Sequence, residues 1–258
     1  MQHKDFSEKV VLIPGGTSSI GYAAARAFIL NGAKVVLAGR RVQEGKAAEE
    51  ELGRITDDVL FVQADVSDEE QVVRLLDKTI ERFGRIDIAF NNAGIKGTSR
   101  MVEEITEQQF NAVMNGNLKS TWLCCKHEIL AFKQQQSKGV IINTSSWLSK
   151  ATYVGSAMYA ASKAAIDSLT RSMAVENAPI GIRINNINPG YIAPPAMEGM
   201  LQRSSEEVQM THHIPYKRPG KAQEVAELVL WLASDACSYL TGQTIFIDGG
   251  LSIAGQNL

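Results

Sequence analysis

Seven short runs of β-branched and aromatic residues recur along the chain, separated by longer segments of helical periodicity. The runs occupy residues 10–13, 34–38, 59–63, 86–90, 140–143, 182–187 and 244–248. Their hydrophobicity is continuous rather than alternating, as is typical of strands covered on both faces. Strands that alternate with helices predict an α/β fold of the doubly wound, Rossmann type, with a seven-stranded parallel sheet and helices on both faces.

The composition narrows the class of protein. A chain of 258 residues, 45% of them hydrophobic, is large enough to bury one core, so we expect a single domain over residues 1–258. A net charge of −2 gives no electrostatic reason to expect nucleic acid or an anionic membrane as a partner. The start of the chain is polar and lacks a signal-peptide pattern, and no apolar run is long enough to span a membrane, which predicts a cytoplasmic location.

The cysteines and histidines do not form a recognisable binding pattern. Cys124, Cys125 and Cys237 lack C-x-x-C spacing and are odd in number, so we predict buried free thiols in a reducing compartment. The four histidines lack metal-ligand spacing, so we predict no metal site.

Helix-capping patterns and one unusual loop complete the outline. Ser67 with Glu70, and Thr106 with Gln109, match the capping-box pattern at two helix starts. Residues 190–219 are rich in Pro, Met and Ser and are long for a plain connection, which predicts a lid over a substrate pocket.

A glycine-rich turn joins the first predicted strand to an Ala-rich helix over residues 14–21, with the sequence PGGTSSIG. Glycine permits a sharp turn and a close approach to a pyrophosphate, and the helix start offers free N–H groups and the positive end of the helix dipole. We therefore predict a dinucleotide site here; the alternative is an ordinary tight turn. The candidate cofactor-binding residues are Gly15, Thr17, Ser18, Ser19, Ile20 and Gly21.

Arg40 and Arg41 end the second predicted strand, where an acidic residue would bind the ribose hydroxyls of NAD. A guanidinium matches phosphate geometry, so the sequence favours NADP(H) over NAD(H); the alternative is that the two side chains simply face solvent. Further candidates follow the third and fourth strands, where ligands bind in open α/β sheets, although turn roles are an alternative. They are Asp65, Val66, Asn92, Ala93 and Gly94.

Tyr159 and Lys163 are four residues apart in an Ala-rich segment, which puts both side chains on one face of a helix. An ammonium beside a phenol is expected to lower the phenol's pKa and allow proton exchange with a substrate. Taken alone, the spacing also fits an exposed pair with no role.

In combination, these motifs resemble the short-chain dehydrogenase/reductase family over nearly the whole chain. The family's T-G-x-x-x-G-x-G motif corresponds to residues 14–21, its N-N-A-G turn to residues 91–94, and its Y-x-x-x-K pair to Tyr159 and Lys163. Ser146 and Asn117 fall at the positions of the family's catalytic serine and asparagine. Residues 189–190 (Pro-Gly) and 248–250 (Asp-Gly-Gly) resemble two further signatures.

The resemblance implies hydride transfer between NADP(H) and a ketone, an aldehyde or a secondary alcohol. Tyr159 would transfer the proton, and Lys163 would lower its pKa and bind the nicotinamide ribose. Ser146, with Ser145 as its rival, would hold the substrate oxygen, and Asn117 would position a water. The resemblance adds Pro189, Gly190 and Ile192 to the cofactor site.

Two alternatives stay open: an NAD-dependent sugar or hydroxysteroid-type dehydrogenase, and a nucleotide-binding sensor or scaffold with low activity. A homotetramer is expected by analogy with the family, joined through the Tyr-Lys helix, the long helix before it and the last strand.

The chain departs from the family at three positions. Pro14 and Pro194 replace threonines, and Ser19 replaces the middle glycine of the turn. Because Pro14 lacks the hydroxyl and the N–H of threonine, we expect it to loosen the contact between the glycine-rich turn and residues 91–94. Six further residues are candidates to line an apolar substrate pocket, and plain packing in the core is an equal alternative for them. They are Trp147, Tyr153, Tyr191, Met197, Met200 and Leu201.

Overall fold

The structure is a computed structural model that describes residues 5–193 and 211–254. Within these ranges, seven parallel strands form one sheet in the order β3-β2-β1-β4-β5-β6-β7. The strands are β1 (Val10–Pro14), β2 (Lys34–Gly39), β3 (Val59–Gln63), β4 (Ile88–Asn91), β5 (Gly139–Thr144), β6 (Ile182–Pro189) and β7 (Thr244–Ile247). The predicted seven-stranded parallel sheet is confirmed, and only the fourth strand begins later than expected.

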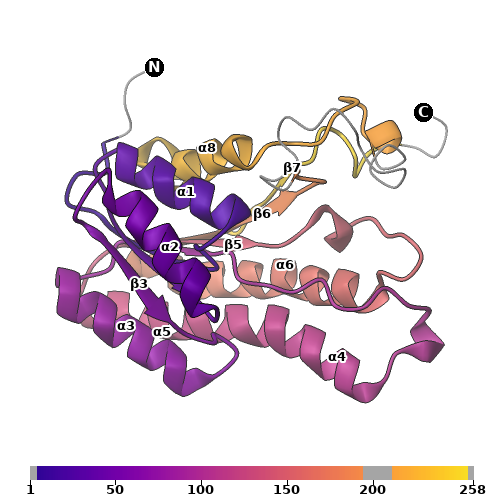
Figure 1. Cartoon of the computed structure of the whole chain (residues 1–258), viewed down its shortest axis with the longest axis horizontal. Helices are drawn as coiled ribbons and strands as arrows, with labels where there is room; N and C mark the ends of the chain where they lie inside the picture. Colours follow the sequence, from indigo (N-terminus) through magenta and orange to yellow (C-terminus); the bar gives the residue numbers. More distant parts are fainter. Residues whose placement is uncertain (1–4, 194–210, 255–258) are drawn as a thin grey trace.

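Helices cover both faces of the sheet, as predicted (Figure 1). One face is covered by α1 (Ser19–Leu30), α2 (Val42–Gly53) and α8 (Ala222–Ala233). The other is covered by α3 (Glu69–Phe83), α5 (Ser120–Gln134) and α6 (Ala157–Asn177), with α4 (Glu107–Met114) against α6. Short helical turns are η1 (Val102–Glu104), η2 (Asn115–Lys119), η3 (Trp147–Ser149), η4 (Ala178–Ile180) and η6 (Asp235–Cys237).

The inner strand β1 contributes side chains to both hydrophobic layers of the core. Val11 and Ile13 are buried on the side of α1 and α8, while Leu12 is buried on the side of α3 and α5. Successive side chains of a strand point to opposite faces, so a continuous apolar run is what a sheet covered on both faces requires. None of the helices in the described ranges is long and apolar enough to cross a membrane.

The two predicted capping boxes have different outcomes. The one that starts α4 is confirmed: Thr106 Oγ1 accepts from the N–H of Gln109 at 3.2 Å, and the Gln109 side chain accepts from the N–H of Thr106 at 3.0 Å. The capping box predicted at Ser67 is wrong, because Asp68 caps α3: its side chain accepts a hydrogen bond from the N–H of Gln71 at 3.2 Å. The Ser67 hydroxyl instead donates to Asp65 Oδ1 at 2.7 Å.

The three cysteines are buried free thiols, as predicted. Burial raises the pKa of Cys124 and of Cys125 well above the usual value, which leaves both as unreactive thiols. Near them, Glu128 of α5 is fully buried and its Oε2 accepts from Asn91 Nδ2 at 3.0 Å. Burial raises the pKa of Glu128 to about 8, so its carboxyl group keeps its proton at neutral pH.

Stability should therefore depend on the protonation of Glu128. Between the ordinary pKa of 4.5 and the folded value of about 8, the folded chain binds one proton that the unfolded chain releases, so the free energy of unfolding falls as pH rises through this window. We expect Glu128→Gln, which keeps the neutral shape, to remove that fall and to exceed the parent by roughly 2 to 4 kcal/mol near pH 8.5. Urea unfolding near pH 5 and near pH 8.5 measures the difference.

The matched control is Glu176→Gln, an exposed position near the end of α6, which should keep the pH dependence of the parent. An unchanged pH dependence in Glu128→Gln would show that Glu128 is ionised in the folded chain.

Candidate active site

The glycine-rich turn after β1 packs directly against the turn after β4, where the strand order of the sheet reverses. Gly15 has a φ of +77°, and a Cβ there would lie 2.6 Å from the backbone nitrogen of Ala93. The N–H of Asn92 donates to the Pro14 carbonyl at 2.9 Å, and Asn92 Nδ2 donates to the Gly15 carbonyl at 3.1 Å. Contrary to expectation, Pro14 leaves the two turns in contact, because its carbonyl rather than its missing N–H makes the bond.

The same turn opens helix α1 in a way that fits a pyrophosphate. A Cβ at Gly21 would overlap the carbonyl oxygen of Gly15, so the turn leaves no room for a side chain at this position. The Ser18 side chain does not cap α1, which leaves the N–H groups of the first turn for an anion. The closed turn and the uncapped helix start together fit the phosphates of a dinucleotide.

A cavity of about 520 Å³ extends from this turn along the carboxyl ends of the strands. Most of the predicted cofactor residues line it: Gly15, Thr17, Ser18, Ser19, Arg40, Arg41, Asp65, Val66, Asn92, Ala93 and Gly94. Other lining residues were not predicted: Ala38, Gly39, Ala64, Ser67, Ile95, Ala112, Asn115, Gly116 and Ser120. The first five of these flank predicted residues in sequence, whereas the last four are brought to the cavity by α4, η2 and the start of α5.

Two arginines lie at the edge of this cavity and are held by carboxylates. Arg40 is 64% exposed, and its Nη1 lies 3.9 Å from Asp65 Oδ2. Arg41 Nη1 lies 3.0 Å from Glu44 Oε1, one turn along the same chain segment. Both guanidinium groups can therefore reach a ligand in the cavity. Such a ligand would compete with the two carboxylates for the guanidinium groups, and exposed ion pairs of this kind are weak.

Tyr159 and Lys163 lie on one face of α6, as their spacing predicts. Lys163 Nζ is 5.6 Å from the centroid of the Tyr159 ring and donates to the Thr144 carbonyl at 2.8 Å. Lys163 is almost fully buried, and burial lowers its pKa to about 8, an effect partly opposed by the charge of Asp167.

The expected effect on the Tyr159 phenol is not observed. Burial raises the pKa of Tyr159, and the hydrogen bond from Ser146 lowers it only in part. Lys163 points its ammonium at the Thr144 carbonyl, so the predicted lowering by the nearby positive charge is wrong for this structure. The phenol therefore holds its proton at neutral pH.

The structure distinguishes Ser146 from Ser145, the alternative candidate for the catalytic serine. Ser146 interacts with the Tyr159 phenol, and its Oγ accepts from the N–H of Leu148 at 3.2 Å. Ser145 instead donates to the carbonyl of Lys163 at 2.9 Å, which ties the end of β5 to α6. The hydroxyl that faces the phenol is thus the one that the spacing favours.

Asn117 is fully buried in η2, a single turn of π-helix between α4 and α5. Its Oδ1 accepts from the N–H of Ile95 at 2.8 Å, and its Nδ2 donates to the Ile95 carbonyl and to Ser162 Oγ, each at 3.0 Å. A Cβ at Gly94 would lie 3.1 Å from Asn117 Oδ1 and 3.4 Å from Lys163 Nζ. Asn117 and Lys163 thus meet at Gly94, which lines the cavity.

Known proteins share this sequence and this fold. A family model described as enoyl-(acyl carrier protein) reductase matches residues 15–252. A glucose 1-dehydrogenase from Gluconobacter oxydans is 35% identical over 259 residues, which cover 98% of this chain and 96% of the relative. A levodione reductase from Leifsonia aquatica is 38% identical over 260 residues, which cover 96% of each chain.

Among solved structures, a 3-ketoacyl-(acyl-carrier-protein) reductase from Brucella melitensis, complexed with NADH, matches with a TM-score of 0.88 and 30% identity, over 96% of this chain and 100% of that one. The chain belongs to the short-chain dehydrogenase/reductase family. It is accordingly an oxidoreductase that acts on CH–OH or C=O groups of small molecules with NAD(P)(H).

In this short-chain dehydrogenase/reductase, the departure at Ser19 has a structural consequence. Ser19 has a φ of +47°, in the left-handed region that favours glycine. The serine therefore adopts, at a cost in free energy, a backbone conformation that a glycine would adopt freely.

The two remaining family signatures pack on each other. A Cβ at Gly190 would lie 2.6 Å from the Cα of Asp248, so the Pro-Gly and Asp-Gly-Gly segments require this glycine at their contact. Asp248 holds its own turn by accepting from the N–H of Gly250 at 2.9 Å and of Ser252 at 2.7 Å.

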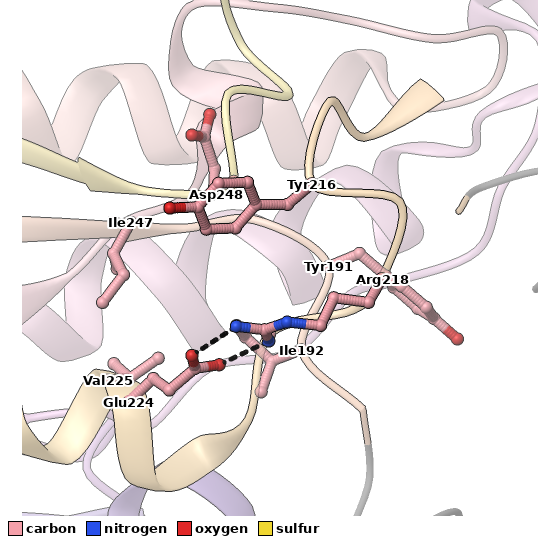
Figure 2. Close-up of a pocket in the computed structure, with 10 residues that line it drawn as sticks. Tyr191, Ile192, Tyr216, Arg218, Glu224, Val225, Ile247 and Asp248 are labelled. Atoms are coloured by element: carbon pink, nitrogen blue, oxygen red, sulfur yellow. Dashed lines mark hydrogen bonds and ion pairs between the residues drawn. The ribbon is translucent and has the colours of Figure 1, made fainter. Parts of the chain in front are cut away.

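A second, smaller cavity of about 120 Å³ is lined in part by Asp248 and Gly249 of these segments (Figure 2). Arg218 and Glu224 cross it with two hydrogen bonds of 2.8 and 2.6 Å, which lower the pKa of Glu224 to about 2. Ile192 lines this cavity, and the Tyr191 ring extends away from the ion pair (Figure 2).

Of the substrate-pocket candidates, Trp147 and Tyr153 stack with ring centroids 6.4 Å apart, and Tyr153 is near enough to Tyr159 to affect its pKa. Tyr191 lines the smaller cavity, and the other three candidates, Met197, Met200 and Leu201, lie outside the described residues. Pro194, one of the departures from the family, also lies outside them, as does most of the predicted lid. No group of His, Cys, Asp or Glu in the described ranges is arranged to hold a metal ion.

Proposed function

We propose that the chain reduces a ketone or an aldehyde with NADPH, or carries out the reverse oxidation of a secondary alcohol, with Tyr159 as the general acid or base. The observation that carries this proposal is the Tyr159 phenol, which interacts with Ser146 and lies one helical turn from Lys163. The Lys163 ammonium in turn adjoins Gly94, which lines the 520 Å³ cavity. A proton donor, an oxygen-holding hydroxyl and a cofactor-sized cavity thus adjoin one another.

The roles follow from the protonation states. A bound NADPH supplies the hydride. The Tyr159 phenol, which keeps its proton at neutral pH, donates that proton to the substrate oxygen as negative charge develops there. Ser146 hydrogen-bonds the same oxygen, and Lys163 places a positive charge near the reacting groups and binds the nicotinamide ribose. Asn117 holds the Gly94 turn through Ile95. By the family resemblance, it would also position a water beside Lys163.

A panel of carbonyl compounds and alcohols tests this function, with the loss or gain of NADPH absorbance as the readout. The panel includes a sugar and an unsaturated thioester, because one relative is named for glucose and the family model for enoyl reduction. We expect turnover with a ketone or its alcohol that disappears in Tyr159→Phe. If none of the compounds is turned over, or if Tyr159→Phe performs like the parent, the proposal fails.

The choice of NADP(H) over NAD(H) is supported by the two arginines at the edge of the cavity and by the lack of an acid at either position. A ribose 2′-phosphate at Arg40 would replace the loose contact of 3.9 Å with Asp65 by charge-assisted hydrogen bonds. NAD(H) use is the alternative, as in the NADH complex of the related 3-ketoacyl reductase.

Arg40→Ala is expected to discriminate between the two cofactors. Loss of a charge-assisted contact to the 2′-phosphate should weaken NADPH binding roughly 10- to 50-fold, whereas NADH binding should change less than about 2-fold. Isothermal titration with each cofactor measures both values. Arg54→Ala, at an exposed arginine of the segment after α2, is the control and should bind both as the parent does. Equal binding of NADH and NADPH, unaffected by Arg40→Ala, would contradict the assignment.

Self-association through α5, α6 and β7 stays a prediction of the family resemblance. It is supported by exposed apolar side chains on these helices, with Trp122 at 42%, Leu130 at 51% and Val175 at 77% exposure.

A further inference from the structure

Asn188 of β6 lies beneath the turn that carries Ser146. Its side chain is fully buried, and its Nδ2 donates to the Ser146 carbonyl at 2.8 Å and to Ser149 Oγ at 2.7 Å. Ser146 precedes the short helix η3 and Ser149 ends it. One buried amide therefore joins the two ends of this turn.

The same amide also reaches helix α6. Asn188 Nδ2 lies 3.3 Å from Asp167 Oδ2, and Asp167 Oδ1 accepts from Asn186 Nδ2 at 3.0 Å. Because an amide has only two N–H hydrogens, the longer contact to Asp167 is shared with the bonds to the turn. Asp167 follows Lys163 by one helical turn, so Asn188 connects the Ser146 turn to the helix that carries Tyr159 and Lys163.

This connection matters because the two hydroxyl groups come from different elements. Ser146 follows β5, whereas Tyr159 is on α6, and the chain between them includes the turn of η3 and a loop. Two groups that must bind one substrate oxygen need to be placed within a few tenths of an ångström of their productive positions. Within the described ranges, Asn188 bonds to both ends of the Ser146 turn and also contacts α6.

Stability alone explains this residue poorly. Asn188 Oδ1 is buried and has no hydrogen-bond partner among the described residues. A buried oxygen without a partner costs free energy, which the two bonds to the Ser146 turn must offset. The Asn188 amide therefore fixes the position of the Ser146 turn, although its own oxygen lacks a hydrogen bond.

We propose that Asn188 is a positioning residue that holds the Ser146 turn against α6, so that the Ser146 hydroxyl and the Tyr159 phenol converge on the same substrate oxygen. This inference rests on the proposed function, because it assigns Asn188 a part in the same reaction. Asn188 itself touches neither the substrate nor the cofactor; it acts through Ser146.

A double-mutant cycle tests this dependence on Ser146. Asn188→Ala is expected to lower kcat about 10- to 100-fold in the parent while the NADPH Kd changes less than about 2-fold. In a Ser146→Ala background, the same substitution should lower kcat by less than about 3-fold, since the hydroxyl that it positions is already gone. Equal losses in both backgrounds, or an unchanged kcat in the parent, would overturn the inference.

The control is Asn185→Ala, at a fully buried asparagine of the same strand whose Nδ2 donates to the Leu240 carbonyl at 2.9 Å. It should lose stability to a similar degree yet keep kcat within about 2-fold of the parent. If Asn188→Ala does not fold, Ser149→Ala removes the second acceptor of the amide. Introduced into the parent, Ser149→Ala should lower kcat about 3-fold, whereas introduced into Ser146→Ala it should leave kcat unchanged. An unchanged kcat when Ser149→Ala is introduced into the parent would count against the inference.

The cycle also separates this inference from the proposed function. A parent chain without turnover on any carbonyl compound or alcohol would refute the proposed function, and this inference with it. A parent chain that turns over, combined with additive losses in the cycle, would refute the role of Asn188 alone.

Discussion

Tyr159→Phe is expected to lower kcat by about 10³-fold with little change in the binding of NADPH. The substitution removes only the phenol oxygen, so the ring keeps its place in α6, 5.6 Å from Lys163 Nζ. Without that oxygen, the substrate alkoxide must take its proton from water, and the interaction with Ser146 loses its partner. The loss should therefore appear in kcat rather than in cofactor affinity.

Steady-state turnover of the best compound in the panel measures this effect. Tyr239→Phe serves as the control, because it removes a phenol oxygen from a fully exposed ring in the loop after η6 and should leave kcat within about 2-fold of the parent. A variant at Tyr159 that retains a tenth or more of the parental kcat would assign the proton transfer to another group.

The second large effect is expected at the phosphate turn. A Cβ at Gly21 would overlap the Gly15 carbonyl oxygen, and Gly15 in turn lies against the backbone of Ala93. Gly21→Ala must therefore displace the start of α1 from the turn and misalign the N–H groups that face the phosphates. With one or two charge-assisted hydrogen bonds lost, NADPH should bind at least about 100-fold more weakly, or roughly 3 kcal/mol.

Gly53→Ala provides the comparison, because a Cβ at Gly53, the last residue of α2, meets nothing within 4 Å. It should bind NADPH as the parent does and be at least as stable, since alanine favours a helix over glycine. Titration with NADPH, together with circular dichroism to establish folding, gives both values. A folded Gly21→Ala variant with the parental Kd would place the phosphates elsewhere.

The fold follows from the sequence because its signals are local and repeated. Each apolar run needs burial on both faces, as Leu12 and its neighbours Val11 and Ile13 show, and only a covered parallel sheet gives every run that environment. The glycine turn is equally local, since the carbonyl of Gly15 and the missing Cβ of Gly21 concern residues six apart. Such features can be predicted without knowing the three-dimensional structure.

The features that were mispredicted or missed depend on burial and on contacts between distant segments. The pKa of Tyr159 rises because the ring is buried, and the spacing to Lys163 does not reveal that burial. Ser67 and Asp68 are both good helix caps, and the contact of Ser67 with Asp65 decides between them. Asn188 meets Ser146 only because β6 lies beside β5 in the sheet.

The most direct test of the proposed reaction follows a deuterium label from the cofactor. NADPH that carries deuterium at the transferred position of the nicotinamide is incubated with a ketone of the panel, and the alcohol product is analysed by mass spectrometry. We predict one deuterium on the carbinol carbon of the product with the parent chain, and about 10³-fold less labelled product per unit time with Tyr159→Phe. A product without deuterium, or equal rates of labelling by the two proteins, would contradict hydride transfer assisted by Tyr159.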